Sequence, residues 1–410
     1  MLMKQAHIDS MGGPYSYLFL GNGKIEKLSR PKCGYIYFKT YRKNLLTQER
    51  EEYSFEHFIN KLNQSMLLPK GNDKRIIHLF YESGHYILPN PSESSQIQSL
   101  NNEQILAVDL VYKYAEVEKI KAYDDKINTQ CKSEEKVDQS KYRQKFLQGR
   151  EELIKGECYQ FNLTYPKRIK LPEGFSFSFI FKKMVSDPQK AGAFAHGTYL
   201  GCEQMALISN SPECLFQAEK KDNGIHIWTM PIKGTIDNVN NETKRNWKLL
   251  AQSKKDEGEL NMITDLLRND LSRINNSISK VVFKKRMLVV PGLIHQFSLI
   301  ETLLPFSISL GKVIQSLFPG GSITGAPKKN VMKILDRLEG GRERGFYTGS
   351  TILLDKTRMV ASVNIRSGEI DLEKKIMKVG AGGGITLLSD SKEEYKEMED
   401  KRESFLDLFN

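Results

Sequence analysis

Two residues near the middle of the chain have side chains that could perform acid, base or nucleophilic chemistry. Lys233 lies in the segment PIKGT, between an apolar stretch and a glycine. Burial lowers the pKa of a lysine, and the neutral amine can then act as a nucleophile or a base. Glu213 lies in SPECLFQ, directly before a predicted strand. A carboxyl group screened from water can act as a general acid. Taken alone, Lys233 fits an ordinary solvated surface charge better, and the local signal at Glu213 is weak.

Two glycine-rich segments could bind an anion. FPGGSITGAPKKN leads into a predicted helix at Pro327, and free amide groups at the start of a helix favour anions. Ser322 and Thr324 add hydroxyl donors within it. The second segment, VGAGGGI, follows a predicted strand and could turn several backbone N–H groups towards a carboxylate. Each segment could also be a simple turn. The second segment ends in three consecutive glycines, Gly382, Gly383 and Gly384.

Four carboxylates have a spacing that suits a divalent cation. Asp256 and Glu259 lie three residues apart in a predicted helix, so one face of that helix could present both. Glu394 and Glu397 repeat this spacing near the C-terminus. Oxygen ligands without histidine suit Mg²⁺. The alternative is a solvated helix surface, on which acidic residues at this spacing are common.

The elements that must position these residues mix strands and helices. Residues 1–116 form a short β-rich region with a hairpin at Gly21, Asn22 and Gly23, and residues 117–138 form a polar linker or exposed helix. Residues 139–410 form the catalytic region, which makes one composite unit with the N-terminal strands. We expect helices at 139–155, 242–252, 258–274, directly after Pro327, and at 392–408. Strands are expected between them, including SFSFIF at 176–181. This irregular order favours the α+β class.

The composition argues for a folded intracellular protein. The chain has 410 residues, of which 39% are hydrophobic, and a formal net charge of +11. Nucleic-acid binding is one reading of that charge, but 50 acidic residues offset the 61 basic ones and no nucleic-acid motif is present. Five cysteines without CxxC spacing disfavour disulfides and zinc, which fits the cytoplasm. Neither a signal peptide nor a membrane span is evident.

Several of these segments occur together in a characteristic order. SPECLFQ, PIKGT, ELNMITDLLRNDLSR, FPGGSITGAPK, FYTGS, NIRS, AGGGI and EEYKEMEDK follow one another along the chain. This series resembles the chorismate-utilising enzymes over about residues 140–405. The resemblance implies large antiparallel β-sheets packed as a two-lobed sandwich with helices on the outside. It also implies that Lys233 and Glu213 are catalytic.

Two positions select a branch of this family. Lys233 in PIKGT resembles the aminodeoxychorismate synthase component I branch, and Gln160 stands where relatives that add water have a lysine. The implied reaction is amination of chorismate at C4: Lys233 attacks C2 and Glu213 protonates the departing hydroxyl. The ammonia is expected from a separate glutamine amidotransferase subunit. The alternatives are anthranilate synthase component I and a non-catalytic chorismate-binding protein.

The resemblance also assigns the remaining site residues. Mg²⁺ is expected on Asp256, Glu259, Glu394 and Glu397, where it would bind the ring carboxylate. Arg366 and Tyr347 are expected to hold the other carboxylate. The full set of expected substrate-binding residues is Gln160, His295, Ser322, Thr324, Tyr347, Arg366, Gly382, Gly383 and Gly384.

Overall fold

The strands join into one continuous antiparallel series. The computed structural model describes residues 12–68, 71–88, 101–120, 132–133, 137–172, 175–238, 242–290 and 293–409. Every strand pair among them is antiparallel. From one end to the other, the order is β15 (Leu293–Leu304), β12 (Gly224–Thr229), β11 (Cys214–Lys221), β18 (Arg358–Val363), β17 (Ser350–Leu354), β5 (Lys74–Leu79), β6 (Ala107–Lys119), β2 (Lys24–Tyr37), β1 (Tyr15–Gly21), β9 (His196–Leu200), β10 (Met205–Ser209), β19 (Ser367–Asp371), β20 (Ile376–Ile385) and β8 (Gln160–Lys170).

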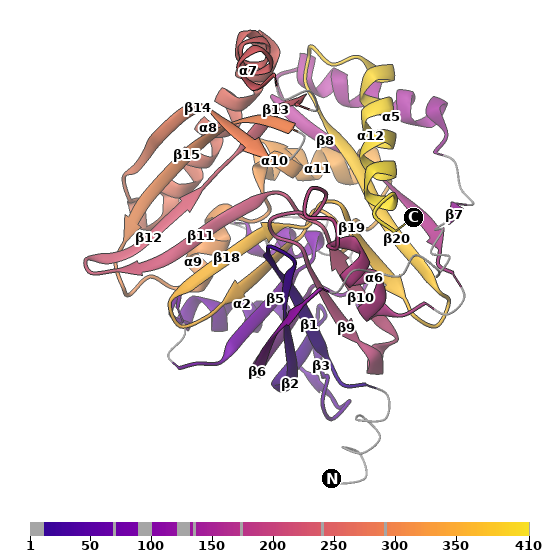
Figure 1. Ribbon diagram of the computed structural model, residues 1–410, viewed down its shortest axis with the longest axis vertical. Coiled ribbons are helices and arrows are strands. Elements are labelled where there is room, and N and C mark those ends of the chain that lie inside the picture. The colour runs from indigo at the N-terminus through magenta and orange to yellow at the C-terminus, as the bar shows by residue number, and fades with distance from the viewer. Residues whose placement is uncertain are drawn as a thin grey trace.

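Further strands extend this series at its ends and along one side. β13 (Ile232–Asp237) and β14 (Ser279–Val290) both pair with β15. β7 (Lys132–Ser133) and β16 (Gly325–Ala326) pair with β8. β3 (Tyr41–Asn44) pairs with β2, and β4 (Arg50–Glu52) pairs with β3. In Figure 1 the N-terminal strands lie at the bottom, and the strands around β12 and β15 lie opposite those around β20.

The helices pack on these strands. α5, α7, α8, α11 and α12 lie close to the ranges expected from the sequence, and α8 begins four residues earlier than predicted because Ser253 caps it through the Asp256 amide. The helices are α2 (Phe55–Gln64), α3 (Gly84–Ile87), α5 (Gln139–Ile154), α6 (Phe177–Met184), α7 (Thr243–Gln252), α8 (Lys254–Arg273), α9 (Leu310–Leu317), α10 (Gly321–Thr324), α11 (Lys328–Glu339) and α12 (Ser391–Leu406). The predicted α+β class with large antiparallel sheets is confirmed.

Two local predictions differ from the structure. SFSFIF is not a strand but the start of α6, whose buried residues are Phe177, Ile180, Phe181 and Met184. That spacing is helical. The segment at 117–138 begins inside a strand, since residues 117–119 complete β6. Residues 121–131 and 134–136 lie outside the described residues, and 132–133 form β7.

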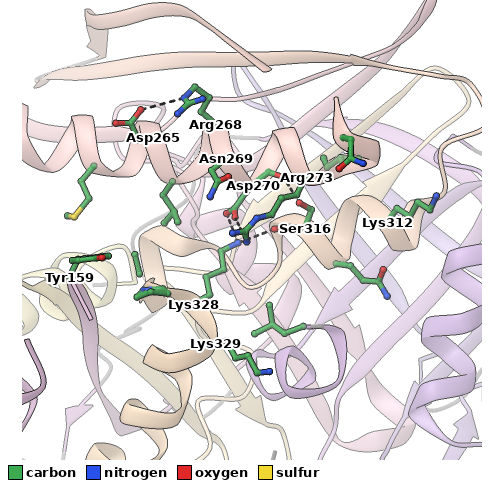
Figure 2. A pocket seen from close by; sticks show the side chains of 18 residues that line it. Tyr159, Asp265, Arg268, Asn269, Asp270, Arg273, Lys312, Ser316, Lys328 and Lys329 are labelled. Carbon is green, nitrogen blue, oxygen red and sulfur yellow. Dashed lines mark hydrogen bonds and ion pairs between the residues drawn. The ribbon is translucent and has the colours of Figure 1, made fainter. Parts of the chain in front are cut away.

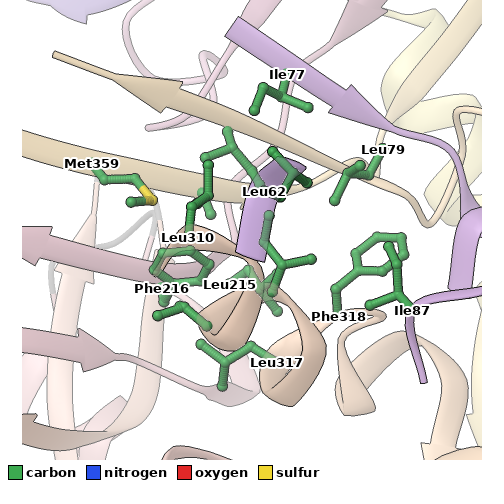
Figure 3. Close-up of a cluster of buried hydrophobic side chains, with 14 of the residues drawn as sticks. Leu62, Ile77, Leu79, Ile87, Leu215, Phe216, Leu310, Leu317, Phe318 and Met359 are labelled. Carbon is green, nitrogen blue, oxygen red and sulfur yellow. The ribbon is translucent and has the colours of Figure 1, made fainter. Parts of the chain in front are cut away.

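One hydrophobic core joins the N-terminal region to β11, the strand that directly follows Glu213 (Figure 3). Its side chains come from α2, β5, β11, α9 and β18, and burying each such side chain contributes about 1.5–3 kcal/mol. β11 is thereby fixed on one face by N-terminal side chains, and Glu213 immediately precedes β11. The labelled members are Leu62, Ile77, Leu79, Ile87, Leu215, Phe216, Leu310, Leu317, Phe318 and Met359.

No helix in the described part of the chain is long and apolar enough to cross a membrane.

Candidate active site

A cavity of about 190 Å³ brings most of the predicted site residues together. It lies among β8, β13, α10, β20, α12, the start of β11 and the turn between β18 and β19. Both predicted catalytic residues face it. The predicted residues that line it are Glu213, Lys233, Ser322, Tyr347, Arg366, Gly382, Gly383 and Gly384.

Glu213 is held at this cavity by two serines. Its backbone N–H donates to Ser211 Oγ at 3.2 Å, and its Oε1 accepts from Ser322 Oγ at 2.5 Å. Burial raises the pKa of the Glu213 carboxyl group, while the Ser322 hydroxyl and the charges of Lys233 and Lys401 oppose that rise. A carboxyl group whose pKa is raised is suited to donate a proton near neutral pH.

Lys233 reaches the cavity from β13. Its side chain is only 23% exposed, which removes the alternative of a freely solvated surface lysine. The ammonium Nζ lies 3.9 Å from Oε2 of Glu259. Gly234, the next residue, has φ +76°, and β13 is irregular here where it pairs with β15. A Cβ at Gly234 would lie 2.8 Å from Nε2 of Gln296 and 2.9 Å from Cβ of Asp256. Only glycine fits between β15 and α8 at this point.

Arg366 offers a positive charge to the cavity. It lies between β18 and β19 with φ +49°. Burial lowers the pKa of its guanidinium group from the usual value. Within the described ranges, no carboxylate lies within ion-pair distance of this guanidinium, so an anionic ligand would be its natural partner. Tyr347 packs beneath Gly380, where an added Cβ would lie 2.2 Å from its ring, and burial raises the Tyr347 pKa to about 12.

The three consecutive glycines lie inside a strand rather than in a turn. Gly382, Gly383 and Gly384 pair with β8, whereas β19 pairs with β20 only up to Val379. The missing side chains give room to neighbours. A Cβ at Gly383 would lie 2.9 Å from Glu394 Oε2, and one at Gly384 would lie 2.4 Å from Gln160 Nε2. These glycines therefore line the cavity, and the space beside Gly383 and Gly384 is taken by the side chains of Glu394 and Gln160.

Three predicted substrate-binding residues do not line the cavity. Thr324 is fully buried, and its hydroxyl donates to Gly320 O at 2.9 Å within the α10 turn. Gln160 is buried beside Gly384. His295 bonds Thr235 through Nδ1 at 2.9 Å, and burial together with the charge of Arg366 lowers its pKa. In this structure Thr324, Gln160 and His295 bond or pack against their neighbours and do not line the cavity.

The four predicted metal ligands flank the same region in two pairs. Glu394 accepts from Ser389 Oγ at 2.8 Å, and burial raises its pKa. Burial would raise the pKa of Glu397 as well, but the Lys401 ammonium, 2.6 Å away, lowers it. Glu259 faces Lys233. Among the described residues, no three acidic, histidine or cysteine side chains lie close enough together to hold an ion. The oxygen-only donors suit Mg²⁺, but in this structure lysines neutralise two of them.

Sequence reasoning missed several residues of the cavity, and two of them, Lys401 and Asn162, have polar side chains that bond other site residues. Lys401 of α12 lines the cavity, bonds Glu397 and lies 3.5 Å from Gly382 O. It follows Glu397 by one helical turn, so the spacing could have revealed it. Asn162 of β8 donates from Nδ2 to Ser322 O at 2.6 Å. Its place beside Ser322 depends on strand pairing, which no local pattern shows.

A larger cavity of about 1190 Å³ lies on the other side of the GAPKK segment (Figure 2). Pro327 and Lys328, at the start of α11, line it, so the predicted anion-binding helix start faces away from Glu213 and Lys233. Some of its charges are already engaged: Lys328 Nζ lies 2.6 Å from Asp270 Oδ2 and Arg268 Nε lies 3.5 Å from Asp265 Oδ1. The smaller cavity is therefore the candidate active site.

Comparison with known proteins is consistent with this site. The family described as chorismate binding enzyme matches residues 33–407. A protein named aminodeoxychorismate synthase component 1 from Salmonella typhimurium is 34% identical over 265 residues, which cover 63% of this chain and 55% of that protein. Its Escherichia coli namesake is 33% identical over 267 residues with the same coverage. The chain thus spans about half the length of these two relatives.

The fold also has a solved counterpart. Anthranilate synthase component I from Streptococcus pneumoniae superposes with a TM-score of 0.72 at 17% sequence identity, covering 96% of this chain and 92% of that one. At this identity the likeness shows the fold alone.

Proposed function

Because the chain belongs to the family of chorismate binding enzymes, we propose that it aminates chorismate at C4 to give 4-amino-4-deoxychorismate. The observation that carries the proposal is the shared cavity, which presents the amine of Lys233, the carboxyl group of Glu213 and the guanidinium of Arg366 to one ligand. The names of the relatives from Salmonella typhimurium and Escherichia coli support the same reaction.

The proposed mechanism uses Lys233 and Glu213 in two substitutions. The neutral amine of Lys233 attacks C2, the ring double bonds shift, and the C4–O bond breaks. Glu213 donates its proton to the departing hydroxyl, which leaves as water. Ammonia then adds at C4 and gives up one proton to the Glu213 carboxylate, the double bonds shift back, and Lys233 leaves C2 as an amine. The sum is chorismate and ammonia to aminodeoxychorismate and water.

Arg366 and Tyr347 orient the substrate in this proposal. A buried guanidinium that lacks an acidic partner gains a charge-assisted pair when a carboxylate arrives. Gln160 has an amide where a lysine would have an amine, so it cannot act as the base that would activate water in place of ammonia. The rival reaction, amination at C2 to anthranilate, needs an open approach to C2, and in the proposed mechanism Lys233 would occupy that approach.

We also propose that Mg²⁺ takes part, held by Asp256, Glu259, Glu394 and Glu397. Bound there, the ion would neutralise the ring carboxylate of the substrate. The oxygen-only donor set and the position of both acid pairs beside the cavity support this. Lys233 pairs with Glu259 and Lys401 pairs with Glu397. A cation that neutralised these glutamates in place of the lysines would leave both lysines available to the substrate.

The proposed ammonia source is a separate glutamine amidotransferase subunit. The component 1 naming of the relatives supports a second component. The proposed compartment is the cytoplasm, as the cysteine pattern predicts.

The test is to incubate purified protein with chorismate, Mg²⁺ and ammonium and to identify the product by mass. A product that a lyase converts to p-aminobenzoate supports C4 amination. Anthranilate would establish the rival reaction, and binding of chorismate without turnover would favour a non-catalytic binding protein.

A further inference from the structure

Arg344 lies just behind the wall of the candidate active site. It is in the segment between α11 and β17 and is 4% exposed. Its guanidinium forms a two-pronged pair with Glu339, with Nη2 to Oε1 at 2.7 Å and Nε to Oε2 at 2.9 Å. The Tyr81 ring packs against this guanidinium at 4.4 Å. The Glu82 carboxylate accepts the Arg344 backbone N–H at 2.7 Å. The Tyr81 contact fixes the direction of the Arg344 side chain, and the Glu82 contact fixes its backbone.

The remaining donors of Arg344 all reach residues that line the cavity. Nη2 donates to Asn162 O at 2.6 Å, and Nη1 donates to Ile323 O at 3.1 Å. Nη1 also lies 3.5 Å from Thr348 Oγ1. Arg344 itself does not line the cavity. A planar guanidinium with five donors can tie β8, α10 and the segment before β17 together, which a lysine cannot do.

A short chain of bonds leads from this contact to the acid. Arg344 holds Asn162 O, the Asn162 amide holds Ser322 O at 2.6 Å, and Ser322 Oγ donates to Glu213 Oε1 at 2.5 Å. Glu339 steadies the same wall, because its Oε1 accepts both N–H and Oγ1 of Thr164 at 3.0 and 2.9 Å.

We propose that Arg344 is a positioning residue for catalysis: through Asn162 and Ile323 it fixes the α10 segment so that Ser322 holds Glu213 in place for proton donation. The inference rests on the proposed function for its kinetic readout. Its structural part, the control of Glu213 by Arg344, can be measured without turnover.

The test variant is Arg344→Lys, which keeps the charge and loses the two-pronged pair. Glu213 faces three groups: Ser322 on α10, Lys233 on β13 and Lys401 on α12. Only the Ser322 bond depends on Arg344. Loss of a donor disfavours the carboxylate, so the Glu213 titration should move up by about half to one pH unit. The Glu213 titration would be followed by ¹³C NMR of protein labelled at glutamate, without substrate. The signal that is missing in Glu213→Gln would be assigned to Glu213. The kcat should fall about tenfold, with KM changing less than about twofold.

The matched control is Arg75→Lys. Arg75 forms an equivalent two-pronged pair with Asp109, at 2.8 and 2.7 Å, between β5 and β6 and away from the cavity. This variant should lower the melting temperature to a similar degree and leave kcat and the Glu213 titration unchanged. If Arg344→Lys fails to fold, Glu339→Gln replaces it, because it weakens the same pair with its shape conserved.

The double variant with Ser322→Ala tests the route. In that background Arg344→Lys should change kcat less than about twofold, since the bond it acts through is gone. The proposal would be overturned if Arg344→Lys left the pKa of Glu213 unchanged. It would also be overturned if Arg344→Lys lowered kcat as much in the Ser322→Ala background as in wild type. If the wild-type protein does not convert chorismate, the proposed function is wrong. The titration would still test separately whether Arg344 controls Glu213.

Discussion

Gly234→Ala tests whether the fold requires a glycine directly after Lys233. The backbone there has φ +76°, and an alanine in this left-handed region costs about 1–2 kcal/mol. Its methyl group would also lie 2.8 Å from Gln296 Nε2 and 2.9 Å from Asp256 Cβ. Gln296 is fully buried, so the crowding cannot be relieved into solvent and adds about 1–3 kcal/mol. We expect a total loss of about 2–5 kcal/mol.

Gly156→Ala separates the two contributions. Gly156 has φ +77°, and an added Cβ would meet no atom within 4 Å. It should lose only the backbone cost, about 1–2 kcal/mol. Urea unfolding of both variants gives the free energies. The amination assay should show a loss of at least about tenfold in kcat/KM for Gly234→Ala, because β13 must shift and carry Lys233 with it. Equal destabilisation by the two substitutions would refute the steric argument, and full activity of Gly234→Ala would refute the positional one.

Three further predictions concern the acid, the metal and the start of α11. The kcat of wild type should fall as pH rises through the raised pKa of Glu213, because the protonated form donates; Glu213→Gln should abolish this alkaline limb along with most activity. Glu397→Gln should raise the Mg²⁺ concentration needed for half-maximal rate, and an unaltered Mg²⁺ titration would remove it from the ligand set. Lys328→Met should cost about 3–5 kcal/mol in urea unfolding, because the buried Asp270 carboxylate would lose its close partner and keep only the exposed Arg273 at 4.0 Å; a loss below about 1 kcal/mol would contradict this.

The parts of the fold that follow from local pattern could be predicted from the sequence. Helix α8 and its i, i+3 acids, and the strand that follows Glu213, depend on periodicity and on turn residues. SFSFIF misled because phenylalanine occupies every second position from 175 to 181. Extended to Met184, the segment shows the helical spacing of Phe177, Ile180, Phe181 and Met184 that the structure buries.

The supporting residues of the site could not be predicted in the same way. Arg344 reaches Asn162 across 182 residues of chain, and Asn162 reaches Ser322 across 160. These contacts exist only after β8, α10 and α11 have packed together. Thr324 and Gln160 were placed in the site by motif, but a motif does not say which of its side chains faces the cavity.

The central claim is that Lys233 directs ammonia to C4. The most direct measurement supplies chorismate and ¹⁵N-labelled ammonium to wild type and to Lys233→Ala and locates the nitrogen in the product by NMR. We predict nitrogen bonded to C4 with wild type, and loss of most of this product with Lys233→Ala. Nitrogen bonded to C2, or undiminished C4 amination by the variant, would contradict the account.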